Sequence, residues 1–413
     1  MSKIEKVVAL SDLHLGSKES YLYSKNPNYQ QNQNALITLL NQLGPPDELI
    51  INGDLMELSL AGFDEVYRDL KAFIGLLAKE KLYKRIVFIP GNHDHHFWRL
   101  LVEQVYVNGK ISNGELPPGN YKYSCCFVNE QFPNDNGKLT CQTILSNLWD
   151  DNNKKKKKKN DSPKIFVKYP HHVISVNSGN GTVQNYLFTH GHFLEDLFKP
   201  INYFMEPHQL EELEAFNNIW LEVFDYHIGH AGRLSDRARE IEEKYQKGDK
   251  EAKLIINKTI NSIYDNVNAR LKLSWWKGFL IKFILRTIVK RIPLKRQCGL
   301  FQVPIDEKLT ESITEYITKY IVQRYTDGKS NEFYFSCDED IPTPFTFVFG
   351  HTHRPLKGKD LLEKKVKIQD EEYPLANTGG WLRTDGNGYG DNAGVLVIDK
   401  SGVRWETLEG KLE

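Results

Sequence analysis

Three short apolar runs in the first hundred residues each end at a cluster of polar residues. The runs Val7–Ser11, Glu48–Asn52 and Arg85–Pro90 lead directly into Asp12, Gly53-Asp54 and Gly91-Asn92-His93-Asp94. Between the runs, Asn34–Leu43 and Phe63–Leu82 carry apolar residues at helical spacing. The alternation predicts a largely parallel, buried sheet with helices outside it. Sites in such folds form at the carboxyl ends of strands, which is where each polar cluster lies.

Further strand-like runs and a low-complexity stretch follow. Lys164–Asn177 and Val183–Thr189 predict strands, and the second leads into His190. Gly, Asn, Pro and Lys are frequent in residues 129–162, which include a run of lysines at 154–159. We therefore expect a disordered insert at 130–163. The lysine run predicts a solvated tract, with binding to an anionic surface as the alternative.

A long helical stretch separates these strands from the last part of the chain. Residues 206–296 have helical character, whereas Thr343–Phe349 is strand-like and leads into Gly350-His351-Thr352-His353. Three more runs predict antiparallel closure of a second sheet: Tyr373–Asn377, Gly394–Asp399 and Val403–Leu408. We therefore expect a core at 1–195 and 343–413 with a helical insertion, or lid, at 196–342.

The composition says little about partners and more about the compartment. The 413 residues include 54 basic and 54 acidic side chains, so charge balance gives no argument for nucleic-acid or acidic partners. Five cysteines without a Cys-x-x-Cys pair favour a reducing compartment over a disulfide framework. The sequence shows neither a signal-peptide apolar region nor an uncharged apolar stretch of about 18 residues. We expect a cytoplasmic location.

The polar clusters share side chains that bind metal ions. The clusters are Asp12-x-His14, Gly53-Asp54, Gly91-Asn92-His93-Asp94, His190 and Gly350-His351-Thr352-His353. Carboxylates, amide oxygens and imidazoles together suit Mn, Fe or Zn. Alternate residues of an extended chain project to the same side, so Asp12 and His14 can converge on one site, as can His351 and His353. The glycines before Asp54, Asn92 and His351 fit sharp turns where the backbone approaches a ligand closely.

This ordered set resembles the calcineurin-like metallophosphoesterase superfamily, over about residues 5–195 and 343–410. The resemblance implies an α/β fold, a four-layer α-β-β-α sandwich of two mixed sheets with a helical insertion. It also implies two divalent metal ions, for which we expect Mn, with Fe or Zn as alternatives. The implied ligands are Asp12, His14 and His353 for the first ion, Asp54 for both, and Asn92, His190 and His351 for the second.

The resemblance also implies roles for the two residues after Asn92. His93 would lie beside the phosphate and stabilise or protonate the leaving oxygen. Asp94 would orient His93 through a ring nitrogen. Two cations would lower the pKa of a bound water towards ~7, and the resulting hydroxide would attack the phosphorus of a phosphodiester or pyrophosphate in line.

Four further residues near the clusters have two interpretations each. Arg99 and Arg354 are candidates for contacts to the substrate phosphate, with surface salt bridges as the alternative. His95 and His96 could line the pocket, or could be ordinary polar residues at the start of a helix.

The amino-acid sequences of three clusters indicate a substrate class. Ser11–Leu15, Gly53–Glu57 and Gly350–Pro355 look most like UDP-2,3-diacylglucosamine pyrophosphohydrolases, which cleave a pyrophosphate on a lipid at the membrane surface beneath a helical lid. The resemblance therefore implies a lipid-linked or nucleotide-linked substrate. The first motif of DNA-repair nucleases in the superfamily has the same residues as Ser11–Gly16, so a DNA-end phosphodiesterase is one alternative. A catalytically silent metal-binding scaffold is another.

A basic segment at 274–296 predicts a membrane contact. It contains lysines, arginines and aromatic residues but no acidic residue. On a helix, Ile281, Leu285 and Ile288 would share one face and Lys282, Arg286 and Lys290 the other. Such a helix suits an anionic bilayer surface, so we expect a peripheral association with a membrane. A lid helix packed on its neighbour, or contact with nucleic acid, are the alternatives.

Overall fold

The computed structural model describes residues 4–80, 83–119, 125–130, 139–153, 162–179, 181–194, 210–218, 221–222, 226–227, 230, 240–241, 244, 248–271, 305–322, 341–383 and 392–408. The lysine run at 154–159 and the basic segment at 274–296 lie outside these residues. The expectations for both therefore stay predictions.

The first sheet has eight strands in the order β13-β12-β1-β2-β3-β6-β4-β5. Their bounds are β1 Lys6–Leu10, β2 Glu48–Asn52, β3 Arg85–Ile89, β4 Cys125–Val128, β5 Leu139–Thr140, β6 Lys164–Tyr169, β12 Gly394–Asp399 and β13 Gly402–Thr407. Strands β1, β2, β3 and β6 run parallel, whereas β12 pairs antiparallel with both β1 and β13, and β4 pairs antiparallel with β6. The central parallel strands are buried on both faces, which explains their continuous apolar sequences.

The second sheet has five strands in the order β10-β11-β9-β8-β7. Their bounds are β7 His171–Asn177, β8 Val183–Thr189, β9 Thr346–Phe349, β10 Lys365–Ile368 and β11 Glu371–Asn377. Strands β8, β9 and β11 run parallel, and β7 and β10 pair antiparallel at the two edges. Both sheets are therefore mixed.

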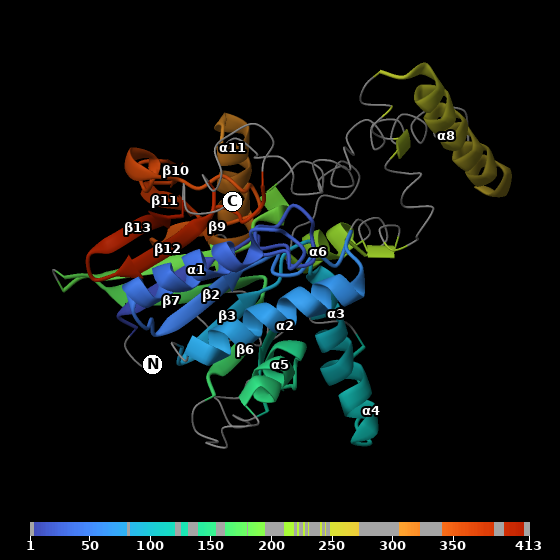
Figure 1. Cartoon of the computed structure of the whole chain (residues 1–413). Helices are drawn as coiled ribbons and strands as arrows, with labels where there is room; N and C mark the ends of the chain where they lie inside the picture. Colours follow the sequence, from blue (N-terminus) through green and yellow to red (C-terminus); the bar gives the residue numbers. More distant parts are fainter. Residues whose placement is uncertain are drawn as a thin grey trace.

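The two sheets pack face to face with helices on their outer sides (Figure 1). Apolar side chains from both sheets fill the space between them, among them Val7, Ile50, Val87, Phe188 and Val348. Helices α1 (Tyr29–Leu43), α2 (Phe63–Glu80) and α5 (Ile144–Asn153) cover the first sheet, and α11 (Glu307–Tyr316) packs on the second. The predicted α/β fold of two mixed sheets between helices is confirmed.

The remaining helices lie near the polar clusters or in the insertion. Helix α3 (His95–Val102) continues through a π-helical turn at Glu103–Gly109 into α4 (Lys110–Ser112), and 3-10 turns occupy His192–Leu194 and Gly358–Asp360. Within 196–342, the elements with described bounds are helical: α6 (Leu210–Asn218), α8 (Lys250–Leu271), α11 and a π-helical turn at Ile317–Val322. Helix α8 stands away from the sheets (Figure 1). Among the described residues, no helix has both the length and the apolar character needed to cross a membrane.

The predicted disordered insert at 130–163 is wrong for residues 139–153, which form β5 and α5. Helix α5 buries Leu145, Leu148 and Trp149 in the core and packs against α2. These apolar residues do have helical spacing. The pattern is short, however, and the asparagines and lysines around it resemble a disordered tract.

Two strand assignments also need correction. The run Lys164–Asn177 forms two strands, β6 and β7, which lie in different sheets on either side of Pro170. Of the three runs predicted to close the second sheet by antiparallel pairing, only Tyr373–Asn377 lies in that sheet, and it pairs parallel with β9. Strands β12 and β13 instead extend the first sheet beside β1. A buried apolar pattern identifies a strand, but it does not identify the neighbour with which that strand pairs.

Candidate metal centre

The polar clusters meet because the strands that precede them are neighbours. Strands β1, β2 and β3 are adjacent in the first sheet, and β8 and β9 are adjacent in the second. The side-chain amide of Asn52 donates to the carbonyl of Thr189 at 3.0 Å, which joins the end of β2 to the end of β8. The carboxyl ends of strands from both sheets therefore face one another at a single place.

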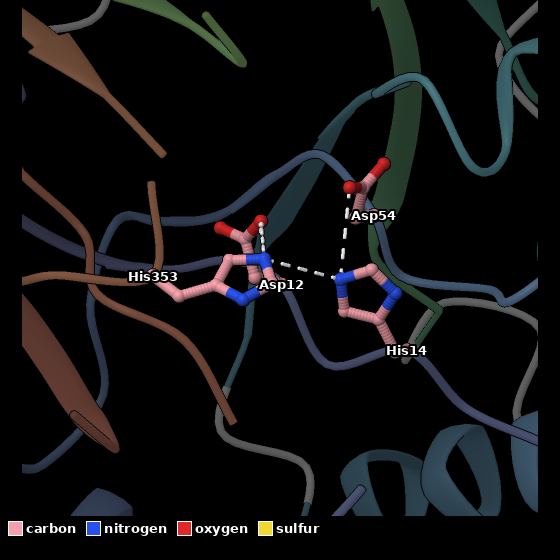
Figure 2. A group of neighbouring side chains, drawn as sticks. All are labelled: Asp12, His14, Asp54 and His353. Carbon is pink, nitrogen blue, oxygen red and sulfur yellow. Dashed lines mark hydrogen bonds and ion pairs between the residues drawn. The ribbon is translucent and has the colours of Figure 1, made fainter. Parts of the chain in front are cut away.

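Asp12, His14, Asp54 and His353 form a first group of metal-ligating side chains, and all four are buried. His353 Nε2 lies 3.0 Å from Asp12 Oδ1 and 3.4 Å from His14 Nε2 (Figure 2). His14 Nε2 in turn lies 3.6 Å from Asp54 Oδ2. Imidazole nitrogens and carboxylate oxygens thus converge on one small volume, which is a donor set that Mn, Fe or Zn accepts.

Asp54, His190 and His351 form a second group, which shares Asp54 with the first. His190 Nε2 lies 3.1 Å from Asp54 Oδ2 and 3.1 Å from Asn92 Oδ1. The other ring nitrogen, Nδ1, donates to the backbone carbonyl of Asn52 at 3.0 Å, because a carbonyl can only accept. That bond fixes the ring with Nε2 directed at the shared carboxylate.

Asp54 has the environment of a bridging carboxylate. Its Oδ2 is buried between His14 and His190 and has no hydrogen-bond partner among the described residues. Burial raises the pKa of Asp54, but His190 and His93 outweigh that effect and hold the pKa well below its usual range. An ionised, buried oxygen without a hydrogen bond is costly unless a cation meets it. The residues present therefore fit two cations that share Asp54.

The carboxylates of both groups favour positive charge beside them. Burial raises the pKa of Asp12, but His353 lowers it below the usual value overall. Burial lowers the pKa of His190, but the charge of Asp54 raises it to about 9 overall. A proton or a metal ion can supply that positive charge, and a metal ion does so for several ligands at once.

The backbone is strained at five of the predicted ligands. Asp12, His14, Asp54, His351 and His353 have φ angles of 55°, 45°, 48°, 62° and 52°. Among the described residues, only Leu362 and Gln369 are further non-glycine residues with positive φ. Such conformations cost of order 1–3 kcal/mol each and persist where function requires them. The strain therefore marks the same residues as the donor geometry does.

Gly53 and Gly91 allow the backbone to pass close to the ligands. A Cβ atom at Gly53 would lie 2.0 Å from His190 Nδ1, and one at Gly91 would lie 2.2 Å from Asp54 Oδ1. Gly53 also has a φ of 93°, which side chains rarely adopt. The close approach predicted for these glycines is confirmed.

Glu57, rather than Asp94, orients His93. Glu57 Oε1 lies 2.7 Å from His93 Nδ1, and Oε2 lies 2.9 Å from His14 Nδ1. Burial raises the pKa of Glu57, but His93 and His14 lower it to about 2 overall, so the carboxylate is ionised. Glu57 was not predicted, although a second carboxylate three residues after Asp54 was a signal that could have found it.

Asp94 joins the second and third clusters through their backbones. Its carboxylate accepts hydrogen bonds from the amides of Leu55 at 2.7 Å, Gly91 at 2.6 Å and Met56 at 3.3 Å. Burial and the charge of Asp54 raise its pKa to about 7. Among the described contacts, the Asp94 oxygens bond to backbone amides and the His93 ring nitrogen contacts Glu57, so the predicted orienting role passes from Asp94 to Glu57.

The two arginines predicted to contact phosphate do not belong to either of the two ligand groups. Arg99 is half-buried on α3, with its guanidinium 5.7 Å from the centroid of the Trp98 ring. Arg354 is exposed directly after His353. Their contact with a substrate stays a prediction.

A comparison with protein families agrees with this geometry. The model of the calcineurin-like phosphoesterase family matches residues 5–257. The match includes the first four polar clusters and ends before His351 and His353, which complete the two ligand groups. No curated protein matches the chain.

Proposed function

The chain belongs to the calcineurin-like phosphoesterase family and is a metal-dependent phosphoesterase, and we propose that it hydrolyses a phosphodiester or pyrophosphate with two divalent cations. The observation that carries the proposal is the position of Asp54. Its Oδ2 lies 3.6 Å from His14 Nε2 in one ligand group and 3.1 Å from His190 Nε2 in the other. One carboxylate shared by two groups supports a two-metal hydrolytic site.

Seven residues would hold the cations. They are Asp12, His14 and His353 for the first cation, Asn92, His190 and His351 for the second, and Asp54 for both. When bound, the two cations lower the pKa of a water molecule and stabilise the charge that develops on the reacting oxygens. Mn suits this mixture of carboxylate, amide and imidazole donors, and Fe or Zn accept it as well.

His93 is the acid for the leaving oxygen in this proposal. Its backbone amide donates to Asp54 Oδ1 at 2.9 Å, and its Nδ1 is 2.7 Å from Glu57. With Nδ1 held by the carboxylate, the proton for the leaving group comes from Nε2. Because His93 is only 4% exposed, that transfer takes place with little competition from bulk water.

We further propose a lipid-linked or nucleotide-linked substrate. Support comes from the helices between His190 and His351 and from the amino-acid sequences of three motifs, Ser11–Leu15, Gly53–Glu57 and Gly350–Pro355. Both features are similar to those of UDP-2,3-diacylglucosamine pyrophosphohydrolases. In this proposal the protein is cytoplasmic, and the segment 274–296 docks it peripherally on an anionic membrane.

Hydrolysis of UDP-diacylglucosamine in anionic micelles with added Mn²⁺, measured beside bis-p-nitrophenyl phosphate, tests this function. Cleavage of the lipid supports the whole proposal. Cleavage of bis-p-nitrophenyl phosphate alone keeps the two-cation hydrolase, rejects the lipid substrate, and directs the search to nucleotides and DNA ends. Failure of the Mn²⁺-loaded protein to cleave either compound contradicts the hydrolase and favours the catalytically silent scaffold.

A further inference from the structure

A second cluster, of two acids, one histidine and one tyrosine, joins the helical insertion to the core. Glu214 of α6 is 1% exposed, and both of its carboxylate oxygens have partners. Oε1 lies 2.5 Å from His95 Nε2, and Oε2 accepts a hydrogen bond of 2.7 Å from the hydroxyl of Tyr169. Glu222, also from the insertion, contacts the other nitrogen of His95. We call Glu214, His95, Tyr169 and Glu222 the Glu214 joint.

One arm of the Glu214 joint leads to the third polar cluster. His95 is the first residue of α3 and follows Asn92-His93-Asp94 directly. Its Nδ1 lies 2.9 Å from Glu222 Oε1, so the ring is held between two carboxylates of the insertion. Because each ring nitrogen has an acceptor, the ring can neither shift nor rotate without losing a bond. The insertion thereby holds the first residue of α3, which lies three residues after Asn92.

The other arm leads to the fourth polar cluster. The Tyr169 hydroxyl donates to Glu214 and lies 3.3 Å from Nε2 of His192, from which it can accept. His192 lies two residues after His190. The Tyr169 ring also stacks on Trp98 of α3, with centroids 4.3 Å apart and an interplanar angle of 30°. Contacts at its hydroxyl and on its ring face therefore hold Tyr169 in place.

The two arms end at two residues that meet in the second ligand group. Asn92 Oδ1 and His190 Nε2 are 3.1 Å apart, and no strand pairing joins β3 directly to β8. We propose that Glu214 is a positioning residue for the second cation, because it helps to set the separation of Asn92 from His190, together with the bonds that Asn52 makes to Thr189 and His190. This inference rests on the two-cation function proposed above.

If the joint served only to attach the insertion to the core, it would not need carboxylates, an imidazole and a hydroxyl. Taking an acid and an imidazole out of water offsets most of their attraction, so apolar residues would attach α6 at least as firmly. The hydrogen bonds of the Glu214 joint are directional, so they fix how the joined residues are oriented relative to one another. Groups that bond directly to metal ligands are typically worth 10- to 100-fold in metal affinity, and Glu214 acts one residue further out, so its effect should not exceed the lower end of that range.

Calorimetric titration of the full-length protein with MnCl₂ tests the proposal. We expect Glu214→Gln to weaken one of two Mn²⁺ affinities by up to about tenfold and to leave the other unchanged. Glu212→Gln is the matched control, because Glu212 lies on the same helix but is exposed. Its two affinities should equal those of the wild type.

A smaller substitution keeps the test decisive if Glu214→Gln fails to fold. Tyr169→Phe removes only the hydroxyl that links Glu214 to His192, so it should weaken the same Mn²⁺ site by less. Two wild-type affinities in a folded variant, judged by circular dichroism, would overturn the role of Glu214. A wild type that binds only one Mn²⁺ would instead contradict the two-cation function, and an unchanged affinity in Glu214→Gln would still count against the joint.

Discussion

The metal centre and the Glu214 joint both bring acids and histidine together inside the protein, but they differ in how their polar atoms are satisfied. In the joint, both oxygens of Glu214 and both nitrogens of His95 have partners within 2.9 Å. In the metal centre, Asp54 Oδ2 has no hydrogen-bond partner among the described residues, and His14 and His353 bring two ring nitrogens within 3.4 Å. Buried polar atoms are normally hydrogen-bonded. Several buried oxygens and nitrogens that point at one place without being satisfied there therefore indicate a bound ligand.

The backbone shows the same difference. Positive φ angles occur at Asp12, His14, Asp54, His351 and His353, and at none of the four residues of the Glu214 joint. Strain of this kind is retained where a side chain must be held in a place that an unstrained chain would not reach. The metal centre is therefore built for chemistry, whereas the joint is built to hold parts of the chain at a fixed distance.

The largest expected effect comes from Asp54→Asn. The amide removes the negative charge that both ligand groups share, so turnover of bis-p-nitrophenyl phosphate at saturating Mn²⁺ should fall to background. Circular dichroism should show an intact fold, because the sheets do not depend on this side chain. Turnover near the wild-type rate would contradict the bridging role of Asp54.

The next effect comes from Glu57→Gln, which removes the charge that orients His93. For a diester whose leaving group needs a proton, kcat should fall by about a hundredfold or more. A p-nitrophenolate leaving group needs little protonation, so kcat for bis-p-nitrophenyl phosphate should fall much less. Equal losses for the two substrates would mean that Glu57 acts through His14, its other partner, and not through the acid function.

A smaller effect concerns the stability of the fold, because the stabilisation that His95 of the Glu214 joint contributes should depend on pH. Burial lowers the pKa of His95, but Glu214 raises it to about 9, above the ordinary value of 6.5. Because the folded-state pKa is raised, the stabilisation is complete below the ordinary pKa and is lost as the pH rises through about 9.

Urea unfolding in EDTA, at pH values below and above that interval, measures this loss against His95→Gln. The difference in unfolding free energy between wild type and variant should shrink with rising pH by up to roughly 3 kcal/mol. A difference that stays constant would show that His95 does not carry a charge in the folded protein.

The smallest effect compares two glycines with positive φ. A Cβ at Gly53 would lie 2.0 Å from His190 Nδ1, whereas one at Gly402, where φ is 108°, would meet no atom within 4 Å. Gly402→Ala should therefore cost only the backbone strain, about 1 kcal/mol. Gly53→Ala should cost about 2 kcal/mol more in urea unfolding, because His190 must also move. Equal costs would mean that His190 is not held tightly.

The ligand residues could be predicted because each signal is local. Asp12, Asp54 and Asn92 follow strands whose apolar pattern is clear, and parallel strands bring their carboxyl ends together. Glu57 is nearly as local, but its role depends on the direction of its side chain, which no spacing rule predicts.

The Glu214 joint could not be predicted in the same way. Glu214 and His95 are 119 residues apart, and nothing in the sequence of α6 marks one of its glutamates as buried. The same limit applies to β12, since its apolar pattern predicts a strand but not its place beside β1. Contacts between distant segments depend on how whole elements pack, which local patterns do not specify.

A crystal structure of the protein grown with Mn²⁺, with anomalous scattering used to locate the metal, tests whether two cations share Asp54. A two-cation site would give two Mn²⁺ peaks, one beside Asp12, His14 and His353 and one beside Asn92, His190 and His351, with Asp54 coordinating both. A single peak, or two peaks of which only one contacts Asp54, would contradict it.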